Sequence, residues 1–532
     1  LKSFWLTLAE AETHVYRNHA SAYLIFSFAK MAIIHAIATL LFIVPATAVM
    51  LASPPRLASQ SGLADLRGDG ETNKWKMNEY GEVRQSMKNF YDVQYTAVIK
   101  MGGQPVKSIV DTGSFELLIF SQNCTMCGTK PHLYNGDWST NHTTSGFEKT
   151  HSYGSGSTES VESFDDMEIG PLKLVKQIFW EVYDANMPIL QEDSFASIFG
   201  VGPPTSAAKF AEADKNMVYE QLQDLKDQGI EITDDIMDIV HSYEDAAKHA
   251  WNATSVVEHL DIHTISICMG KETTTDGWVI WNDTSPSRMP DKFMRIDVAG
   301  DSYWSANMTG VKLSSSHGEN SEDFLGCKDT CSAIIDSGTS LIAAPSDVVQ
   351  KLNGIIARWA EKGGTCDDLS ELPDLEFSLN GNLLTLPPQS YVGRASGDYD
   401  TLILGKTPDS VGYGSGITVA CTSLLMPMDV NAPEGPIWIL GMPFFREYYT
   451  SFIFKKGKAH DRLQPYSMGF SRATDECFPG ETPSPDSKLQ LFKKKTDSKL
   501  GAQLNIDVSK ILKPAMHRGR RFVRNLLPVV SK

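Results

Sequence analysis

Two aspartates lie in nearly identical local sequences, and their residue types suit acid–base chemistry. SIVDTGS at residues 108–114 recurs as AIIDSGTS at residues 333–340, so that Asp111 and Asp336 are 225 positions apart. Each has an apolar, strand-like run before it and a small hydroxyl residue, glycine and a second hydroxyl residue after it. A short apolar run ending in glycine also repeats, as IFG at 198–200 and ILG at 439–441. One such frame would suit any turn, whereas two repeated frames predict a paired site.

The chemistry of the pair explains the frames. Gly113 and Gly338 allow backbone N–H groups to approach the carboxylates, and Ser114 and Thr339 can donate further hydrogen bonds. Two carboxyls within hydrogen-bonding reach share one proton, because both cannot ionise cheaply. One can then take a proton from water while the other donates to a carbonyl oxygen. This pattern predicts amide hydrolysis without metal, cofactor or covalent intermediate.

From about Tyr91 to Arg472 the chain resembles the pepsin-like, cathepsin D-like aspartic proteases. The resemblance implies that Asp111 and Asp336 form a catalytic dyad, in which two coupled carboxyls share one proton. It also implies that Thr112 and Ser337 interlock beneath the dyad and that Ser114 and Thr339 bond its outer oxygens. Peptide or protein substrates are the partners that this family implies.

The family's flap, a β-hairpin that closes over substrate, is matched by SYGSGS at residues 152–157. Tyr153 then corresponds to the flap tyrosine and Gly154 to the glycine of its turn.

Two positions depart from the family. Leu118 stands where an aromatic residue usually receives the flap tyrosine's hydrogen bond, so we expect either altered closure or another polar partner. Met442 replaces the aspartate that usually follows the second apolar-glycine run.

Eight cysteines form a second pattern. The close spacing of Cys124 with Cys127 and of Cys327 with Cys331 suits either metal ligation or small disulfide loops, and the lack of nearby histidines favours disulfides. The family resemblance implies both of these loops and a larger bridge between Cys366 and Cys421. For Cys268 and Cys477 two alternatives stay open, a mutual disulfide or free thiols.

The elements that must position the site are mainly strands. From residue 91 to about 199, and again from HTISICMG at 263–270 to Phe470, short β-branched runs are broken by turns. Residues 203–260 differ, because their apolar residues fall at helical spacing among many acids. We expect two helices there, in a solvated surface insertion rather than an exosite, and one more helix near 345–361. The expected fold is predominantly all-β and bilobal.

The N-terminal part predicts entry into the secretory pathway. The uncharged apolar run from Met31 ends in small residues, and ATA at 46–48 suits signal-peptidase cleavage. It is a signal peptide if translation starts at Met31, and a signal anchor if residues 1–30 are made. Five N-x-[ST] sequons are consistent with a glycoprotein. The expected destination is outside the cell or an acidic, lysosome- or vacuole-like compartment, with membrane anchoring as the alternative.

Charge is unevenly distributed along the 532 residues. The net charge is −17, which excludes a general nucleic-acid binder. From Pro479 onward, 12 Lys and Arg face 4 Asp and Glu, a net charge of +8 that leaves −25 on the rest. The basic tail is either a disordered segment, which we favour, or a segment that lies on an anionic membrane.

Together these patterns predict five segments and one leading function. They are a signal peptide or anchor at 1–50, a propeptide-like leader at 51–88, an N-terminal lobe with the flap at 89–265, a C-terminal lobe at 266–475 and the basic tail at 476–532. In the leader, Lys74, Lys76 and Lys88 are candidates to pair with the dyad in a zymogen. We expect a monomeric aspartic endopeptidase, and the alternative is a catalytically silent peptide-binding protein on the same fold.

Overall fold

The computed structural model divides the chain into two units, 1–72 and 73–532. It describes residues 75–128, 133–191, 195–314, 323–396, 420–457, 462–483, 504–507 and 510–513, all in the second unit. The expected signal segment, Lys74 and most of the expected leader lie outside the described residues.

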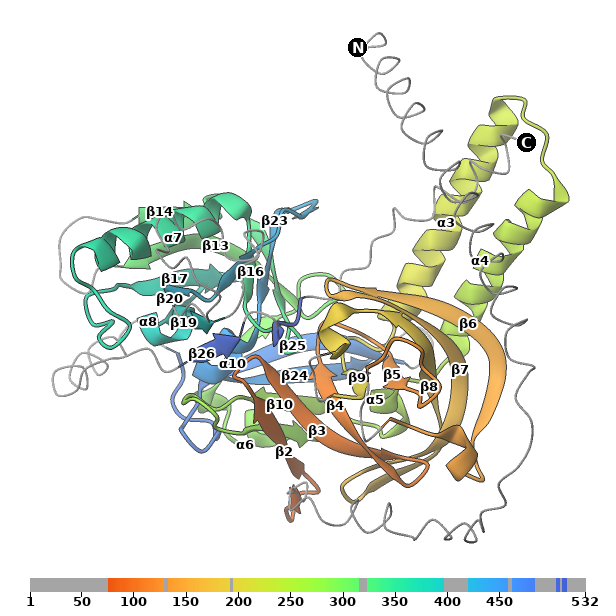
Figure 1. Ribbon diagram of the computed structural model, residues 1–532, viewed down its shortest axis with the longest axis horizontal. Coiled ribbons are helices and arrows are strands. Elements are labelled where there is room, and N and C mark those ends of the chain that lie inside the picture. Colours follow the sequence, from red (N-terminus) through yellow and green to blue (C-terminus); the bar gives the residue numbers. More distant parts are fainter. Residues whose placement is uncertain are drawn as a thin grey trace, which may run out of the picture. The chain divides into compact units, whose positions relative to one another are not determined.

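Strands dominate the described chain, as expected, and form two large sheets and one small sheet (Figure 1). The larger sheet has 14 strands in the order β12-β25-β24-β10-β11-β2-β3-β4-β9-β5-β8-β7-β6, with β1 paired to β2. In chain order they are β1 (Trp75–Met77), β2 (Val83–Phe90), β3 (Gln94–Met101), β4 (Gln104–Asp111), β5 (Leu117–Phe120), β6 (Thr143–Tyr153), β7 (Gly156–Ile169), β8 (Leu172–Asn186), β9 (Ser197–Gly200), β10 (Thr264–Cys268), β11 (Gly277–Trp281), β12 (Met294–Asp297), β24 (Tyr448–Lys456) and β25 (Leu463–Arg472).

The second sheet has nine strands in the order β18-β17-β13-β15-β23-β16-β21, with β14 paired to β13 and β22 to β23, and the small sheet is β20-β19-β26. Their bounds are β13 (Ser305–Ser314), β14 (Asp323–Gly326), β15 (Cys331–Ile335), β16 (Ile342–Ala344), β17 (Asp374–Leu379), β18 (Asn382–Leu386), β19 (Val392–Ser396), β20 (Ala420–Ser423), β21 (Leu425–Pro427), β22 (Asn431–Ala432), β23 (Gly435–Leu440) and β26 (Asn505–Asp507).

The internal repeat of the sequence reappears as a repeated strand pair. β4 pairs in parallel with β9, so that Asp111 lies opposite Gly200. β15 pairs in parallel with β23, with Ile335 opposite Leu440. Central parallel strands are covered on both faces, which is why these runs are continuously apolar rather than alternating. Each aspartate is thus delivered at the end of a buried strand, one from each large sheet.

An aromatic core supports both aspartate strands. Phe199 of β9 stacks on Trp281 of β11 with ring centroids 5.4 Å apart. The fully buried Trp304 packs against Phe452 and Phe454 of β24. The carbonyl of Trp304 accepts a hydrogen bond of 2.8 Å from the backbone N–H of Ile335, next to Asp336. The core therefore holds the two strand ends in place directly.

Part of the region expected to be a leader belongs to the larger sheet. β2 pairs with both β3 and β11, and its side chains alternate between buried and more exposed positions. The ammonium of Lys88 lies 3.6 Å from a carboxylate oxygen of Asp276, so it does not pair with the two aspartates as the sequence suggested. Lys76 is exposed on β1.

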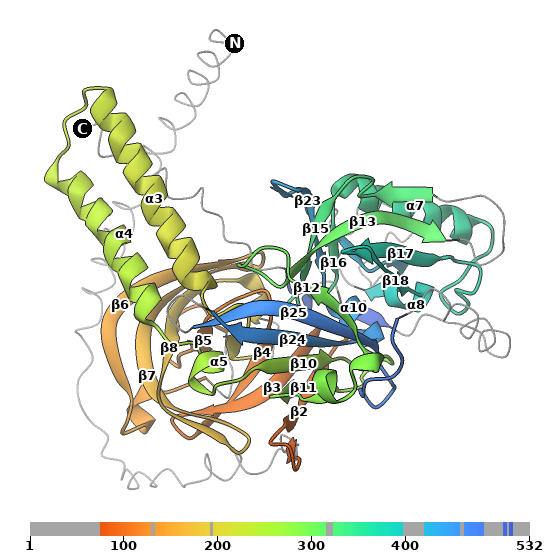
Figure 2. The same cartoon turned by 180° about the vertical axis from the view of Figure 1, so that it is seen from behind.

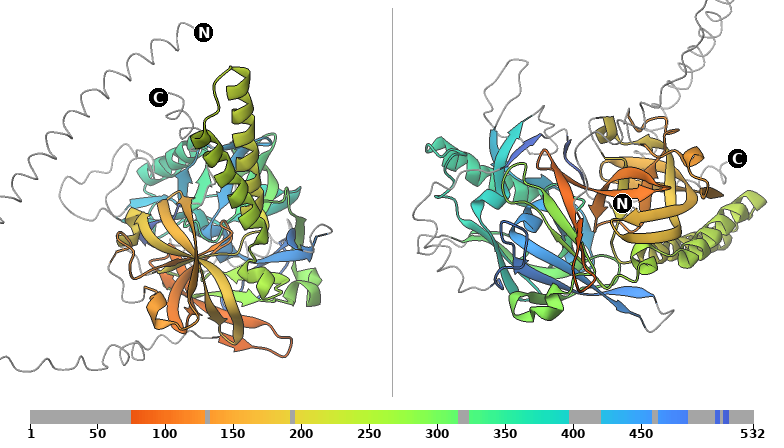
Figure 3. Two further views of the ribbon diagram at one scale, coloured as in Figure 1. Left: turned by 90° about the vertical axis from the view of Figure 1, so that its right-hand side faces the viewer. Right: turned by 90° about the horizontal axis from the view of Figure 1, so that it is seen from below.

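The expected helical insertion is confirmed and forms an antiparallel hairpin of α3 (Ser206–Asp227) and α4 (Asp234–Asn252). Figures 1 and 2 show the hairpin beside β6 and β8, and both views of Figure 3 show it extending beyond the sheets. The Thr233 side chain caps α4 by accepting a hydrogen bond from Ile236. Val218, Leu222, Ile236 and Val240 form a small apolar core between the helices.

The expected third long helix is α7 (Ser346–Glu361). The remaining helices are short: α5 (Val256–His259), α6 (Ser285–Arg288), α8 (Pro388–Tyr391), α10 (Met442–Glu447) and the 3₁₀ turns Gly136–Trp138, Pro188–Gln191 and Pro290–Lys292. Among the residues described here, no helix is both long and apolar enough to cross a membrane.

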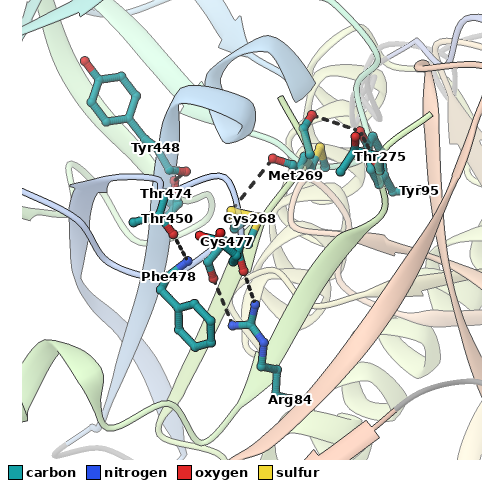
Figure 4. The surroundings of a disulfide bond; sticks show 12 residues. Arg84, Tyr95, Cys268, Met269, Thr275, Tyr448, Thr450, Thr474, Cys477 and Phe478 are labelled. Carbon is teal, nitrogen blue, oxygen red and sulfur yellow. Dashed lines mark hydrogen bonds between the residues drawn. A yellow bond between two sulfur atoms is a disulfide. The ribbon is translucent and has the colours of Figure 1, made fainter. Parts of the chain in front are cut away.

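All eight cysteines form disulfides, Cys124–Cys127, Cys268–Cys477, Cys327–Cys331 and Cys366–Cys421. The second of these joins β10 to the chain that follows β25, and Figure 4 shows its surroundings. Arg84 donates hydrogen bonds to the backbone oxygens of Glu476 and Cys477, and its guanidinium lies 4.2 Å from the centroid of the Phe478 ring. The beginning of the expected basic tail is therefore fastened to the larger sheet.

Candidate active site

Asp111 is held from two directions by its own loop. The backbone N–H of Gly113 donates to one carboxylate oxygen at 2.9 Å, and the hydroxyl of Ser114 donates to the other at 2.6 Å. The carboxyl group is 5% exposed, so these bonds replace most of its hydration.

Asp336 has the same arrangement in the second sheet. The N–H of Gly338 donates to one oxygen at 2.8 Å and the hydroxyl of Thr339 to the other at 2.5 Å. Met442, at the start of α10, packs behind this loop and donates its N–H to the backbone oxygen of Thr339 at 2.9 Å. The position that departs from the family therefore fastens the loop through its backbone.

Thr112 and Ser337 interlock the two loops. The Thr112 hydroxyl donates to the carbonyl of Ile335 at 2.9 Å and accepts from the N–H of Ser337 at 2.9 Å. The Ser337 hydroxyl in turn donates to the carbonyl of Val110 at 2.6 Å and accepts from the N–H of Thr112 at 3.2 Å. These buried bonds cross between the two sheets and set the separation of the aspartates.

The glycines beside the aspartates leave room for the opposite carboxyl group. A Cβ atom on Gly113 would lie 2.6 Å from Cγ of Asp336, and one on Gly338 would lie 2.2 Å from Oδ1 of Asp111. Real Cβ atoms do not approach other heavy atoms this closely, so any side chain at either position would push the carboxyls apart. The glycine in each frame is required by this close approach.

The two carboxyls behave as one electrostatic unit. Burial, and then the negative charge of Asp336, raise the pKa of Asp111 well above its usual range. Burial also raises the pKa of Asp336, although hydrogen bonds from Thr339, Asp111 and Gly338 oppose the rise. A proton is therefore retained by the pair at pH values where an isolated aspartate would be ionised.

A β-hairpin made of β6 and β7 lies next to the aspartates. Tyr153 pairs with Gly156 at its tip, with Gly154 and Ser155 in the turn. Burial, followed by the charges of Asp111 and Glu116, raises the pKa of the Tyr153 hydroxyl well above its usual range. The hydroxyl therefore stays protonated and able to donate.

The surroundings of the flap tyrosine differ from the pattern typical of the family, because the nearby aromatic side chain comes from β8 and not from β5. Leu118 is fully buried and pairs with Trp180 of β8, so an indole is present near the flap but comes from another strand. Its N–H donates to Glu116 at 2.9 Å. His151 of β6 packs edge-on against the same indole, with ring centroids 5.1 Å apart.

Glu116 is the centre of a partly buried charge cluster that the sequence analysis did not identify. Its carboxylate lies 2.6 Å from the ammonium of Lys149 and 3.1 Å from Nε2 of His151. Burial would raise the pKa of Glu116, but the neighbouring Lys149 and His151 outweigh it and hold that pKa well below its usual range. An acid five residues after Asp111, inside an otherwise apolar run, was the signal available.

A cavity of about 500 Å³ opens beside the Asp111 loop. Its walls come from that loop, from the flap strand β6 with Tyr153, and from the facing sides of α3 and α4. Aromatic rings of Phe210, Tyr243 and Tyr303 line it together with Asp214 and Trp180. The helical insertion, expected to be a solvated elaboration, therefore forms one wall of the site.

The predicted residues thus divide into two groups. Asp111, Thr112, Gly113 and Ser114 meet Ser337, Gly338, Thr339 and Asp336 at one point, with Tyr153 and Gly154 on the adjoining flap. The cysteines lie outside that point and fasten loops and chain ends. Within the described ranges there is no cluster of three or more potential metal ligands.

Comparison with known proteins agrees with this geometry. A family model described as eukaryotic aspartyl protease matches residues 94–459. Cathepsin D of Clupea harengus is 27% identical over 400 residues, covering 73% of this chain and 84% of that protein. Pepsin A of Bos taurus is 23% identical over 388 residues, covering 72% and 86%. The chain therefore belongs to the eukaryotic aspartyl protease family, and is an enzyme of the aspartic endopeptidase class.

Proposed function

We propose that this chain hydrolyses peptide bonds with a water molecule activated by Asp111 and Asp336, which share one proton. The observation that carries the proposal is the meeting of two buried carboxyls, each held by a glycine N–H and a hydroxyl, above the interlocked side chains of Thr112 and Ser337. Such a pair offers a base and an acid at one place without a cofactor.

The atoms balance in two steps. In the first, a water proton passes to the ionised carboxylate as the water oxygen bonds to the substrate carbonyl carbon, and the protonated carboxyl gives its proton to the carbonyl oxygen. In the second, the protonated carboxyl gives its proton to the amide nitrogen, and a hydroxyl of the neutral tetrahedral species gives its proton to the ionised carboxylate. The C–N bond breaks to release a carboxylic acid and an amine, and the carboxyl pair again holds its single shared proton. The buried bonds of Thr112 and Ser337 keep the separation of the carboxyls fixed during both steps.

The substrate class follows from the shape of the site. An extended peptide can pair with the flap hairpin through its backbone, and a side chain on the Asp111 side can enter the cavity of about 500 Å³. The aromatic lining of Phe210, Tyr243 and Tyr303 favours a large apolar or aromatic residue there. We infer a monomeric enzyme that acts on peptides or unfolded proteins.

The compartment is inferred from chemistry. Four disulfides form and persist in oxidising surroundings. Asn123, Asn141, Asn252 and Asn307 are exposed, as glycosylation requires, while Asn282 is half-buried. These features support a protein of the secretory route that is secreted or delivered to an acidic compartment. Membrane anchoring would depend on residues outside the described ranges.

Peptide hydrolysis by Asp111→Asn and Asp336→Asn variants tests the mechanism, with Asp297→Asn, at the exposed end of β12, as the matched control. We expect each active-site substitution to lower kcat at least about 10²-fold, since the general acid or base is lost. The control should hydrolyse peptides at the wild-type rate, and this rate should decline with rising pH as it does for wild type. If the chain is instead a catalytically silent peptide-binding protein, wild type and all three variants should bind peptides without cleaving them.

A further inference from the structure

Two stretches of the basic tail, residues 504–507 and 510–513, are bound at the second lobe. The first contains β26, which pairs in parallel with β19, and the N–H of Arg394 donates to the carbonyl of Leu504 at 2.9 Å. Leu504 and Ile506 are 1% exposed. The tail was expected to be disordered, whereas these residues are as buried as the protein core.

The second stretch reaches the loop of Asp336 and the tip of the flap. Leu512 donates its N–H to the hydroxyl of Ser340 at 2.7 Å, and its carbonyl accepts from the N–H of Ser340 at 3.1 Å. Ser340 comes four residues after Asp336. The next residue, Lys513, donates its N–H to the hydroxyl of Ser155 in the flap turn at 3.0 Å. The backbone of the tail therefore bridges the Asp336 loop and the flap.

Ile511 and Leu512, which are neighbours in the tail, pack into two different apolar clusters. Ile511 joins Leu341 and Met426 in one apolar cluster. Its neighbour Leu512 joins the main core and is 6% exposed. The contacts at Ser340 and Ser155 use only backbone atoms of the tail, so they would serve any extended peptide placed there.

Lys510 adds a contact of a different kind. Its carbonyl accepts a hydrogen bond from the Gln94 side chain at 2.8 Å. Its ammonium lies 5.1 Å from the centroid of the Tyr91 ring and 6.0 Å from that of Phe90, an arrangement in which a cation is attracted to the ring faces.

Charge and tethering both favour this docking. The tail from Pro479 carries +8 and the rest of the chain −25, so the two attract each other. The disulfide between Cys268 and Cys477 fastens the start of the tail to the larger sheet. A tethered segment meets its site at an effective concentration in about the millimolar range, much higher than that of most free peptides.

The two sides of the aspartate pair are thus used differently. The open cavity lies on the Asp111 side, lined by Gly113, Ser114 and the helical insertion. The tail lies on the Asp336 side, against Ser340. An extended substrate that passes between the aspartates and the flap would need both sides.

We propose that tail residues 504–507 and 510–513 are an intramolecular ligand of the substrate cleft, bound on the Asp336 side, and that a substrate must displace them. The inference rests on the proposed function, because it takes the cleft between the aspartates and the flap as the substrate site. A competing segment in the same chain lowers the fraction of enzyme that is ready to bind. It therefore raises KM and leaves kcat unchanged.

The test uses the full chain with Leu512→Asp, which places a charge in the apolar position of the tail. Leu491→Asp, a leucine of the same tail outside the described residues, is the matched control. We expect Leu512→Asp to lower KM for a reporter peptide by about 10- to 100-fold, the ratio of a millimolar effective concentration to a free-peptide affinity of about 10–100 μM. A synthetic peptide of residues 502–513 should then inhibit this variant competitively.

The outcomes separate the two proposals. Equal KM values for wild type, Leu512→Asp and Leu491→Asp overturn the intramolecular ligand while the protease function stands. If no form cleaves peptides, the protease function fails, and binding of the fluorescently labelled 502–513 peptide to Leu512→Asp decides the inference. If the labelled peptide binds to Leu512→Asp but not to wild type, whose own tail occupies the site, the result supports the tail as the ligand. If the peptide does not bind to a Leu512→Asp protein that unfolds at the same temperature as wild type, the inference is overturned.

Discussion

At the scale of single residues, the site is defined by hydrogen bonds that each aspartate receives from its own frame. One oxygen of each carboxyl is fixed by a glycine N–H and the other by a hydroxyl. The glycines are irreplaceable for a separate reason, since a Cβ at Gly113 or Gly338 would meet the opposite carboxyl. The frame therefore supplies both the donors and the space that two close carboxyls need.

The raised pKa of Asp111 makes the stability of this site depend on pH. A group whose folded pKa is raised contributes stability at low pH, and that contribution is lost as pH rises through the folded pKa. The ionised Asp111 carboxylate is then buried beside a second negative charge. Asp111→Asn removes that charge, so we expect its Tm to match wild type near pH 3 and to exceed it near pH 7.

Thermal unfolding followed by circular dichroism across this range measures the difference. Asp297→Asn, which is exposed, serves as the control and should track wild type at every pH. A Tm difference for Asp111→Asn that stays constant with pH would mean that the carboxyl pair carries no retained proton.

At the scale of elements, the protein adds a helical hairpin to a sheet-built site. The facing sides of α3 and α4 close the cavity on the Asp111 side, while the outer faces of the helices remain solvated. The flap is also specialised, because Lys149 and His151 of β6 bind Glu116, which directly precedes β5, in a partly buried charge cluster. Both features bear on which side chains a substrate can place in the cavity.

Filling the cavity from α3 should therefore change specificity. Ala211 lines the cavity, whereas Ala213, on the same helix, is exposed. We expect Ala211→Trp to lower kcat/KM about 10-fold or more for peptides with a large residue at this subsite, since one subsite contact is worth about 1–3 kcal/mol. Peptides with a small residue there should be affected less.

Ala213→Trp is the matched control for the loss of helix propensity and the added bulk. Kinetics of both variants with a pair of peptides that differ only at this position make the comparison. If the two variants lose kcat/KM equally, or if both peptides are affected alike, the cavity is not a substrate subsite.

At the scale of the whole molecule, long-range connections hold the ends of the chain against the sheets. The disulfide Cys268–Cys477 spans 209 positions and joins β10 to the beginning of the tail. Farther along the tail, β26 extends the small sheet beside β19. Both connections restrict segments that would otherwise gain much conformational freedom.

Removing the long-range disulfide should lower stability more than removing a local one. In the chain-entropy model the effect grows with the length of the closed loop. We expect the double substitution Cys268→Ala with Cys477→Ala to lower the free energy of unfolding by about 2–5 kcal/mol. The matched control, Cys124→Ala with Cys127→Ala, opens a separation of only three positions and should cost less.

Urea unfolding of both double variants under oxidising conditions measures the two losses. An equal or smaller loss for the Cys268/Cys477 variant would show that the chain around residue 477 is held by its other contacts, such as the Arg84 hydrogen bonds to the backbone of Glu476 and Cys477 (Figure 4).

Several features of this protein can be predicted from local sequence patterns. Local frames carry their own donors and turns, so the repeated Asp111 and Asp336 motifs predicted the family, the predominantly β fold and the interlocking hydroxyls. Helical periodicity likewise predicted α3, α4 and α7, because amphipathic spacing is a property of the segment itself. The family membership and the fold class are confirmed.

The contacts between distant segments become visible only in the folded chain. Leu118 alone could not show that Trp180 would come from the neighbouring strand, nor could Glu116 show that Lys149 and His151 would surround it. The tail has the composition of a disordered segment, yet Leu512 bonds to Ser340 and packs into the main core, which residues from distant parts of the chain form. These contacts depend on surfaces that exist only after folding, and composition and local spacing do not encode them.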